Sequence, residues 1–349
     1  MGATAEGRSA TPIAVSMGDP AGIGLEICLK AWTERRVRKL PPFVLFADLD
    51  ALTERSRQLG LPETVQDIGS LSEAVDVFDR AVPVRPVPLA ARVTPGAPNP
   101  ANAAAVIAAI EQATAAVVGG EAMALVTNPI AKSVLAASGF AYPGHTEFLA
   151  ALAQQHYPGQ CFRPIMMLAS RELRVVPLTV HIPLADVPKA ITRKAIMDTA
   201  RITFEALKRD FSIAAPRVAI TALNPHGGEA GTIGNEERKV IAPAIADLRG
   251  EGFLVTGPHP ADTLFHLGAR AGYDAVIAMY HDQALIPFKT VAFDHGVNVT
   301  LGLPFVRTSP DHGTAFDIAA QACASPQSWI ESLKLAAQIA AARTAAAPR

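Results

Sequence analysis

Three of the nine histidines in the sequence stand directly after apolar, strand-like runs. His181 follows VVPLTV, His226 follows VAITALNP, and His281 follows VIAMY. In open α/β sheets, ligands collect beyond the carboxyl ends of strands, so these imidazoles could converge although 45 and 55 residues separate them. Neutral imidazole binds zinc and similar divalent ions well, and three protein ligands leave a coordination position open for substrate. The sequence therefore indicates a catalytic metal site.

Each of these histidines taken alone is more simply explained as a loop or core residue whose ring bonds to a backbone carbonyl. The sequence has no local metal motif such as HExxH, so the metal prediction depends on the three positions together. The three cysteines, Cys28, Cys161 and Cys323, form no CxxC pair. Separated cysteines are typical of a reducing compartment, which indicates a cytoplasmic protein.

Two other segments carry side chains suited to an anionic ligand. His145 and Thr146 lie in a flexible turn ahead of a helical run, although a threonine N-cap with Glu147 nearby explains this segment equally well. Lys289, Asn298 and Arg307 fall within 19 mostly apolar residues. Arginine supplies a planar fork of donors and lysine a point charge, a combination suited to an anion, while solvated surface charges are the alternative.

Glycine-rich and polar turns offer weaker signals. The segment 18–24, GDPAGIG, follows the first predicted strand, where a phosphate-binding turn would lie, and Asp48 ends the next strand at a spacing suited to a ribose-binding acid. Because GxxxGxG is not the GxGxxG fingerprint, a tight turn is the favoured interpretation. The segment 311–317, DHGTAFD, precedes an apolar helix and could place backbone amides against an anion, or could simply cap that helix.

The elements that position these residues follow an α/β pattern, because short β-rich runs alternate with amphipathic or Ala-rich segments. Ser170–Glu172 between two apolar runs predicts a hairpin, so part of the mainly parallel sheet is antiparallel. Six prolines between Pro83 and Pro100 predict a crossing or linker with neither helix nor central strand. Helices are expected to begin at Thr192, Asn235 and Ser325. The predicted strands are 13–16, 43–47, 124–127, 165–168, 175–180, 218–222, 276–279, 285–288 and 297–301.

The length of 349 residues, half of them apolar, is enough for one large or two medium domains. Residues 1–10 lack a hydrophobic signal region and are expected to form a loose tail, with two intertwined α/β domains over 11–349. The net charge of −1 argues against nucleic-acid and membrane-surface partners. Because Glu111 and Gln112 interrupt the Ala-rich stretch after Asn102, no membrane span of about 20 residues is expected.

In chain order, several strings resemble the 4-hydroxythreonine-4-phosphate dehydrogenase family of vitamin B6 biosynthesis, the PdxA family. The resemblance covers nearly the whole chain from about Ile13 to Ser325. The NPHGGE and YHDQ pair and the long string from Val297 are its specific parts. The strings are SMGDPAGIG, LVTNPIAK, YPGHTEF, NPHGGE, GPHPADTLF, YHDQ and VNVTLGLPFVRTSPDHGTAFD.

The resemblance implies a two-domain α/β/α fold like that of isocitrate and isopropylmalate dehydrogenases, with a mostly parallel sheet, some antiparallel strands and an active site in the cleft between domains. It implies a homodimer whose active sites use both subunits. It further implies that His181, His226 and His281 bind a divalent metal, zinc foremost and magnesium or cobalt otherwise, and that the cofactor is NAD or NADP.

The remaining candidate site residues come from the expected mechanism, in the case of Asp262, and otherwise from the resemblance. Asp262 in PADTLF is a candidate proton acceptor or a partner of a ligand histidine, with a helix cap as the alternative. The DHGTAFD string resembles the segment that related dehydrogenases place against the adenosine half of NAD. The implied substrate-binding residues are His145, Thr146, Lys289, Asn298 and Arg307, and the implied cofactor-binding residues are His312, Gly313, Thr314 and Asp317.

The implied reaction oxidises 4-phosphooxy-L-threonine with NAD to a β-keto acid, which loses carbon dioxide to give 3-amino-2-oxopropyl phosphate. A divalent ion would act as a Lewis acid in both steps. One alternative is a sister dehydrogenase for D-threonate or D-erythronate 4-phosphate, which lack the amino group. A second is a non-catalytic, metal-dependent protein that binds phosphorylated ligands. A third, an acyl or phosphoryl transferase, depends on fold-level analogy alone.

Overall fold

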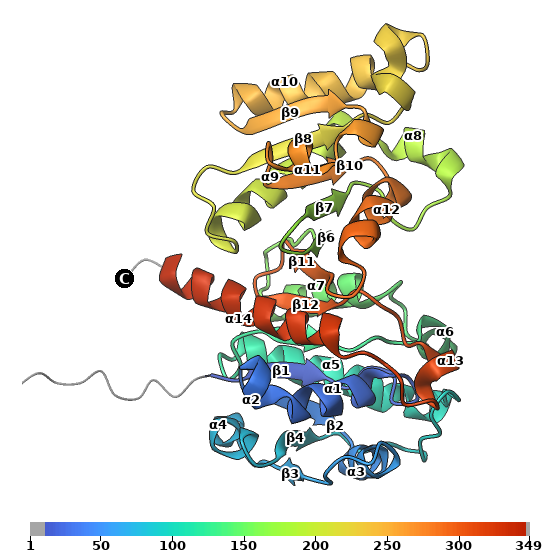
Figure 1. The fold of residues 1–349 in the computed structure, drawn as a ribbon, viewed down its shortest axis with the longest axis vertical. Helices are drawn as coiled ribbons and strands as arrows, with labels where there is room; N and C mark the ends of the chain where they lie inside the picture. Colours follow the sequence, from blue (N-terminus) through green and yellow to red (C-terminus); the bar gives the residue numbers. More distant parts are fainter. Residues whose placement is uncertain (1–10, 347–349) are drawn as a thin grey trace, which may run out of the picture. The chain divides into compact units, whose positions relative to one another are not determined.

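The computed structural model describes residues 11–346, and their contacts divide into two compact units (Figure 1). Unit 1 contains the described residues up to Phe162 together with Pro304–Ala340. Unit 2 contains Arg163–Leu303 and the described residues from Ala341 onward. The chain therefore passes between the units three times, after Phe162, Leu303 and Ala340. The predicted tail, residues 1–10, lies outside the described residues.

The strands of unit 1 run in the order β3-β4-β2-β1-β5-β12, and every neighbouring pair is parallel. β1 and β2 are buried along their whole length, as expected for parallel strands covered on both faces. The polar groups that follow β1, β2 and β5 in sequence therefore lie at one edge of this sheet. The bounds are β1 Ile13–Ser16, β2 Phe43–Ala47, β3 Val65–Asp67, β4 Val82–Pro86, β5 Leu125–Thr127 and β12 Arg307–Pro310.

The core of unit 1 is anchored by aromatic side chains. Phe43 meets Phe78 and Trp329 edge-on, with ring centroids 5.1 and 5.2 Å apart. The indole Nε1 of Trp329 donates to Asn128 Oδ1 at 2.8 Å, which ties the last helix to the loop after β5. The helices are α1 Gly24–Thr33, α2 Arg35–Arg38, α3 Leu49–Gln58, α4 Ala74–Phe78, α5 Ala103–Val118, α6 Lys132–Ala137, α7 His145–His156, α13 Phe316–Ala319 and α14 Gln327–Ala346, with short 3₁₀ turns at Leu71–Glu73 and Pro100–Asn102.

The Ala-rich helix α5 is a core helix of unit 1. By length and composition alone, Pro100–Val118 would suffice to cross a membrane, with a mean hydropathy of 1.5 in its most apolar window. Glu111 therefore does not by itself exclude a span, contrary to the sequence-based argument. Half of that window is buried, and α5 packs on β1, β2 and β5. Its apolar composition is explained by this packing.

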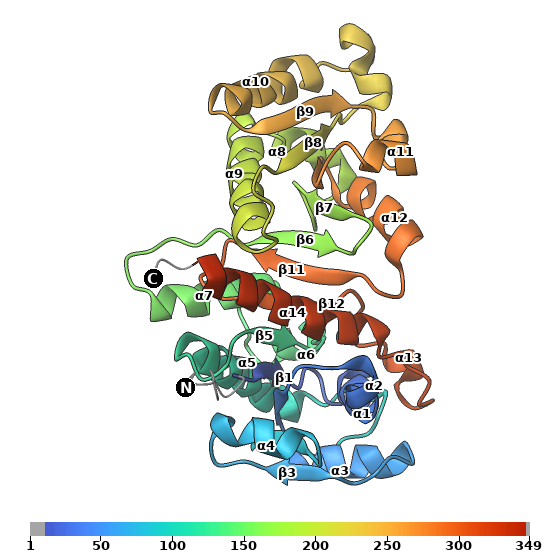
Figure 2. The same cartoon turned by 60° about the vertical axis from the view of Figure 1, so that its left-hand side comes forward.

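The strands of unit 2 run in the order β11-β6-β7-β10-β8-β9. β6 is antiparallel to both β11 and β7, while the pairs from β7 to β9 are parallel. Figure 2 shows β6 and β11 side by side. The predicted hairpin at Ser170–Glu172 is confirmed, because it joins β6 to β7. The bounds are β6 Ile165–Ala169, β7 Arg174–Pro177, β8 Arg217–Thr221, β9 Leu254–His259, β10 Ala275–Ala278 and β11 Val297–Leu301.

The predicted helix starts in unit 2 are borne out. Thr192 caps α9, accepting from Ala195 N at 3.1 Å. The segment after Asn235 begins with a π-helical stretch, Glu237–Ile241, and continues as α10 with Pro243 in its first turn, where proline is tolerated. The helices are α8 Val187–Ala190, α9 Arg193–Arg209, α10 Ala242–Gly250, α11 Leu267–Arg270 and α12 His281–Ala292, with 3₁₀ segments at Leu184–Asp186, Pro225–Gly231 and Ala261–Thr263.

The predicted strand at 285–288 is wrong, because these residues belong to α12. The run LIPF is apolar enough for a buried strand, but the burial of Ala284, Phe288 and Ala292 at intervals of four is helical. Pro287 inside the helix did not prevent it. This difference matters for the site, since it makes His281 the first residue of a helix that also carries Lys289.

The proline-rich stretch after Pro83 was expected to contain no central strand, and this is also wrong. β4 pairs with β2 on one side and with β3 on the other. The paired N–H of Val82 points toward β3 and that of Val87 toward β2. Because backbone N–H groups alternate in direction along a strand, the nitrogen of Pro83 faces β2 and that of Pro86 faces β3. The pairing with β2 begins only at Val84, and the pairing with β3 ends at Val84. Neither proline therefore removes a hydrogen bond from the sheet. Strands β3, β9 and β12 were not predicted.

Candidate active site

Two of the three predicted metal-binding histidines lie together in unit 2. The imidazole rings of His181 and His281 have centroids 6.0 Å apart and are tilted by 45°. Both line a cavity of about 450 Å³, whose other walls are mostly apolar side chains of the segments 180–187 and 280–286. His281 Nδ1 donates to Asp282 Oδ1 at 2.7 Å, which leaves Nε2 as the ring nitrogen with a lone pair. The two imidazoles therefore border the same cavity.

His226 lies in a loop with an unusual backbone. His226 and the four residues after it all have positive φ values, a left-handed run that favours glycine and explains the two glycines of NPHGGE. Glu237 anchors the start of this loop, because its Oε1 accepts from the backbone N–H groups of Leu223 and Asn224 at 2.9 and 2.8 Å. Such strained segments persist where the surroundings over-determine them, and they cluster at functional sites.

Hydrogen bonds join the strand ends that precede the three histidines. Thr179 Oγ1 donates to the carbonyl of Met279 at 2.9 Å, and these residues stand two positions before His181 and His281. Gln283 Nε2 donates to the carbonyl of Ala222 at 2.8 Å, while its Oε1 accepts from Met279 N and from Thr221 Oγ1, each at 2.7 Å. Gln283 thereby connects the carboxyl ends of β8 and β10.

The geometry fits a divalent ion in part. Two imidazoles bound to one zinc ion at about 2.0–2.1 Å would have ring centroids roughly 5–6 Å apart, close to the 6.0 Å between His181 and His281. Within residues 11–346, no group of three His, Cys, Asp or Glu side chains is arranged to hold a metal. The pair is therefore compatible with a shared ion, while His226 does not complete the set.

Three of the side chains that the sequence indicated for an anionic ligand lie in unit 1. Arg307 is only 4% exposed, and its guanidinium donates to Thr127 Oγ1 at 2.6 and 3.2 Å. Burial lowers the pKa of Arg307 to about 10. Burial, followed by the positive charges of Arg307 and Lys132, lowers the pKa of His145 well below 6.5, so its ring is neutral at neutral pH. His145 Nε2 is buried and has no hydrogen-bond partner among the described residues.

Helix α7 presents its amino end in this cluster. Gly144 is the N-cap residue, and no side chain caps the helix, so the threonine-cap explanation for Thr146 is wrong. The first backbone N–H groups of a helix have no partner within it, and they carry a partial positive charge. His145, Thr146 and Arg307, here called the anion cluster, therefore combine a neutral donor, a hydroxyl and a buried cation beside a helix start.

The two remaining predicted substrate residues belong to unit 2. Asn298 lies on β11, and its side-chain Oδ1 is buried without a hydrogen-bond partner among the described residues. A buried acceptor of this kind costs free energy unless a ligand or water donates to it. Lys289 lies on α12, with its Nζ 5.7 Å from the ring centroid of Phe293. The unpartnered Oδ1 of Asn298 could accept a hydrogen bond from a ligand hydroxyl or amino group.

The predicted cofactor segment packs against the glycine-rich turn within unit 1. Ile23 N donates to the carbonyl of Thr314 at 3.0 Å, and a Cβ at Gly22 would lie 2.8 Å from the same oxygen. His312 Nδ1 donates to the carbonyl of Gly313 at 3.0 Å, and Asp317 belongs to the short helix α13. Gly22 thus permits close packing, and the φ of 70° at Gly18 agrees with the tight turn that was the favoured interpretation.

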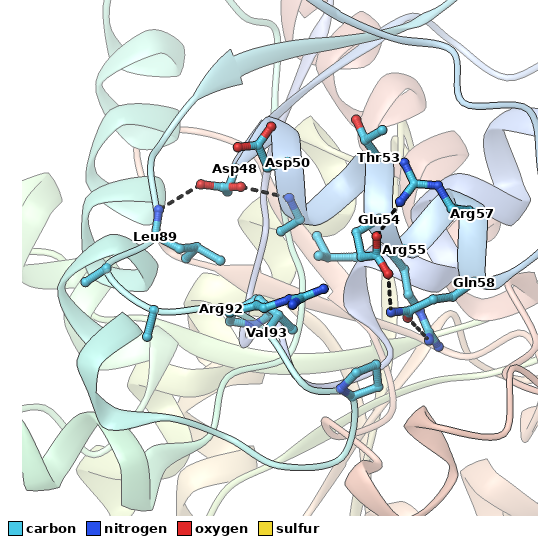
Figure 3. A pocket seen from close by; sticks show the side chains of 16 residues that line it. Asp48, Asp50, Thr53, Glu54, Arg55, Arg57, Gln58, Leu89, Arg92 and Val93 are labelled. Atoms are coloured by element: carbon cyan, nitrogen blue, oxygen red, sulfur yellow. Dashed lines mark hydrogen bonds and ion pairs between the residues drawn. The ribbon is translucent and has the colours of Figure 1, made fainter.

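Asp262 and Asp48 have different surroundings. Asp262 is an exposed residue inside the 3₁₀ turn Ala261–Thr263, whose N-cap is Pro260, so the helix-cap alternative is wrong. Asp48 lines a second cavity, of about 470 Å³, in unit 1 (Figure 3). Its two carboxylate oxygens accept from the backbone N–H groups of Ala51 and Leu89 at 2.8 and 2.9 Å. Asp48 therefore has a structural role, as the N-cap of α3 and as an anchor for the backbone at Leu89.

Sequence reasoning missed three residues that the geometry brings to these sites. Gln283 lies within the YHDQ string and Lys132 within LVTNPIAK, so both strings were noticed while these members were not singled out. Glu237 could not be found, because it belongs to a helix 11 residues after His226 and reaches back to the loop. The available signal for Gln283 was a polar residue two positions after an assigned histidine, His281.

Comparisons with known proteins point to one family. The family model for the pyridoxal phosphate biosynthetic protein PdxA matches residues 39–336. A 4-hydroxythreonine-4-phosphate dehydrogenase of Methylorubrum populi is 54% identical over 331 residues, 94% of each chain. One of Xanthobacter autotrophicus is 50% identical over 339 residues, which cover 97% of this chain and 96% of the relative.

Solved structures extend the likeness to the fold. A crystal structure of 4-hydroxythreonine-4-phosphate dehydrogenase from Klebsiella pneumoniae superposes with a TM-score of 0.83 at 38% identity, covering 95% of this chain and 99% of that one. The mixed sheet, mostly parallel with antiparallel strands, is thus the fold of such an enzyme, and the fold class expected from the sequence is confirmed. The chain belongs to the PdxA family of pyridoxal phosphate biosynthetic proteins.

Proposed function

We propose that this PdxA-family dehydrogenase oxidises 4-phosphooxy-L-threonine with NAD or NADP, and that decarboxylation gives 3-amino-2-oxopropyl phosphate for vitamin B6 biosynthesis in the cytoplasm. The observation that carries the proposal is the pair His181 and His281, which faces a cavity at the carboxyl ends of β7 and β10. The anion cluster in unit 1, with its buried guanidinium and the buried, unpartnered Nε2 of His145, supports a phosphorylated substrate. The names of the relatives support the same substrate.

We assign His181, His226 and His281 as the ligands of a divalent ion, zinc foremost, with cobalt or magnesium as alternatives. When bound, such an ion supplies Lewis acidity that favours loss of the hydroxyl proton and the decarboxylation that follows. His281 is held for this role by its bond to Asp282, which fixes the ring tautomer. The assignment requires His226 to approach the other two, or a second subunit to complete the site in a homodimer.

The remaining residues would bind and orient the substrate. In the anion cluster, the buried guanidinium of Arg307, the hydroxyl of Thr146 and His145 Nε2 would hold one anionic group. Lys289 and Asn298 would hold the rest of the molecule. Binding energy from a phosphate remote from the reacting carbon can be used to position that carbon. Asp262, whose carboxylate is exposed, is our candidate to accept the hydroxyl proton.

The segment containing His312, Gly313, Thr314 and Asp317 is proposed to bind the adenosine half of the cofactor. A Cβ placed on Gly313 would meet nothing within 4 Å, so the backbone there is open to a ligand. Asp317 has a carboxylate suited to ribose hydroxyls. The packing of Gly22 against Thr314 fixes one side of this segment.

The test is formation of NADH with a panel of purified substrates and metal add-back. We expect turnover with 4-phosphooxy-L-threonine and little with D-threonate 4-phosphate or D-erythronate 4-phosphate, because those acids lack the amino group. If the protein prefers D-threonate 4-phosphate or D-erythronate 4-phosphate, it is the sister dehydrogenase for that sugar acid, and the proposed substrate is wrong. If the metal-loaded protein binds these compounds and reduces neither NAD nor NADP with any of them, the chain is a binding protein and the enzyme proposal is wrong.

A further inference from the structure

Lys132 lies beside the anion cluster, although neither the sequence nor the comparisons assign it a role. It begins α6, five residues after Thr127, whose hydroxyl accepts hydrogen bonds from Nε and Nη2 of Arg307. A Cβ at Gly144 would lie 3.3 Å from Lys132 Cε and 3.5 Å from Lys132 Nζ. The ammonium therefore reaches the residue that immediately precedes His145. The loop from β5 thus supports Arg307 at one end and delivers Lys132 at the other.

The neighbouring carboxylate does not neutralise this lysine. Glu147 Oε2 lies 3.5 Å from the same Cβ position at Gly144, but Lys132 and Glu147 form no ion pair within 4.0 Å in the described part of the chain. The charge of Lys132 acts instead on His145, where it adds to that of Arg307 in lowering the pKa, after the larger effect of burial. Two positive charges and an uncapped helix start therefore surround an imidazole nitrogen that lacks a partner.

We propose that Lys132 is a substrate-binding residue, and that together with His145, Thr146 and Arg307 it forms the subsite for the phosphate group rather than for the carboxylate. A phosphate monoester carries a charge of about −1.5 to −2 at neutral pH, against −1 for a carboxylate. Two cations match the phosphate, and His145 Nε2 and the first amides of α7 supply further donors for its three oxygens. This inference rests on the proposed function, since it names the part of the substrate that unit 1 binds.

Inorganic phosphate is the probe that separates this inference from the proposed function. Its dissociation constant is measured by titration calorimetry on the full chain, alongside steady-state kinetics with 4-phosphooxy-L-threonine. For Lys132→Met we expect phosphate affinity to fall by about tenfold or more and KM to rise similarly, with kcat nearly unchanged. Lys132→Arg should restore most of the affinity. The matched control is Lys208→Met, which removes an exposed lysine of α9 in unit 2.

Each outcome decides one of the two proposals. If Lys132→Met binds phosphate as tightly as the unmodified protein and keeps its KM, Lys132 is not part of the subsite, whatever the protein oxidises. If phosphate binding depends on Lys132 while no phosphorylated hydroxy acid is oxidised, the subsite stands and the dehydrogenase proposal fails. An equal loss of phosphate affinity in Lys208→Met would show a general effect of net charge and overturn the inference.

Discussion

The side-chain amide of Gln283 donates a hydrogen bond of 2.8 Å to the carbonyl oxygen of Ala222, and so joins the strand end before His226 to the helix that begins with His281. The same side chain accepts from Met279 N and Thr221 Oγ1. A single glutamine thus joins the ends of the two strands, β8 and β10, that precede two of the proposed metal ligands. Partners of this kind orient ligands without touching the metal.

Gln283→Ala is therefore expected to weaken binding of a divalent ion by roughly ten- to hundredfold, since partners behind metal ligands typically contribute that much. The measurement is competition for zinc or cobalt against a chromophoric chelator. The visible absorption of the cobalt-loaded protein should also change, because it reports the coordination geometry. Gln283→Glu, which keeps the acceptor oxygen, should lose less than the alanine variant.

The same two strands offer a control at their opposite ends. The carboxylate of Asp274 accepts hydrogen bonds from the backbone N–H of Arg217, at 2.7 Å, and from the guanidinium of Arg217. These bonds join the amino end of β10 to that of β8. Asp274→Asn should lower the unfolding temperature without changing metal affinity or the cobalt spectrum. If Asp274→Asn weakens metal binding as much as Gln283→Ala does, then Gln283 acts only through stability and the positioning role is refuted.

His145 should make the stability of the protein depend on pH. Its folded-state pKa lies well below 6.5 because of burial and the charges of Arg307 and Lys132, while Glu147 is the carboxylate nearby. The unfolded chain therefore binds a proton more readily. The stability contributed by neutral His145 is fully present above about pH 6.5 and is lost as the pH falls below that value.

The unfolding free energy of the unmodified protein should fall between about pH 7.5 and about pH 5.5, as measured by urea denaturation. In His145→Gln this fall should be smaller, because no imidazole at this position takes up a proton on unfolding. His156→Gln, at the exposed end of the same helix, is the control and should leave the pH dependence as it is. A pH profile unchanged by His145→Gln would contradict the assignment of a buried neutral imidazole.

The buried ion pair between Glu26 and Arg55 fixes the backbone that follows the proposed cofactor segment. Glu26 is fully buried and accepts from Arg55 Nη2 at 2.6 Å, from Lys30 Nζ at 2.7 Å and from Ala324 N at 2.9 Å. Arg55 also donates to the carbonyl of Ala319 at 2.5 Å. Residues 319–324, which follow directly after Asp317, are thereby fixed to α1 and α3.

Arg55→Met leaves the buried carboxylate of Glu26 paired with Lys30 alone. The expected loss of unfolding free energy is therefore below the roughly 3–5 kcal/mol that follows when a buried charge loses its sole partner, and above the at most about 1 kcal/mol of a surface pair. If the variant folds, its KM for NAD should rise more than its KM for the substrate. Arg57→Met is the control, since Arg57 lies on the same helix but pairs at the surface with Glu54 and Glu63, and surface pairs contribute at most about 1 kcal/mol. Equal effects of the two substitutions would contradict this account.

Much of the fold could be predicted from the sequence where local signals agree with burial. The strand runs around Val15, Leu45 and Val276 and the cap at Thr192 are such cases. Errors arose where a tertiary contact decides: the LIPF run became helical because Phe288 packs into the core of unit 2 with Ala284 and Ala292. β4 tolerates its prolines because its pairing with β2 begins, and its pairing with β3 ends, at Val84. The sequence does not show where these pairings begin and end.

The candidate site divides in the same way. Strand-end placement indicated His181 and His281, and the structure puts their rings together. It could not indicate how His226 lies, because the left-handed run after Asn224 depends on the contacts of Glu237 with that loop. The role of Lys132 likewise depends on the approach of α6 to Gly144, a contact between segments that are separate in sequence.

The most direct test of the whole account is NADH formation from 4-phosphooxy-L-threonine by protein stripped of metal with a chelator, measured at increasing concentrations of added zinc or cobalt. We expect no activity without metal, recovery on addition, and no recovery in His281→Ala. His295→Ala, which removes a histidine that pairs with Glu172 away from the cavity, should recover fully. Turnover that survives metal removal, or His281→Ala recovering as the unmodified protein does, would contradict the central claim.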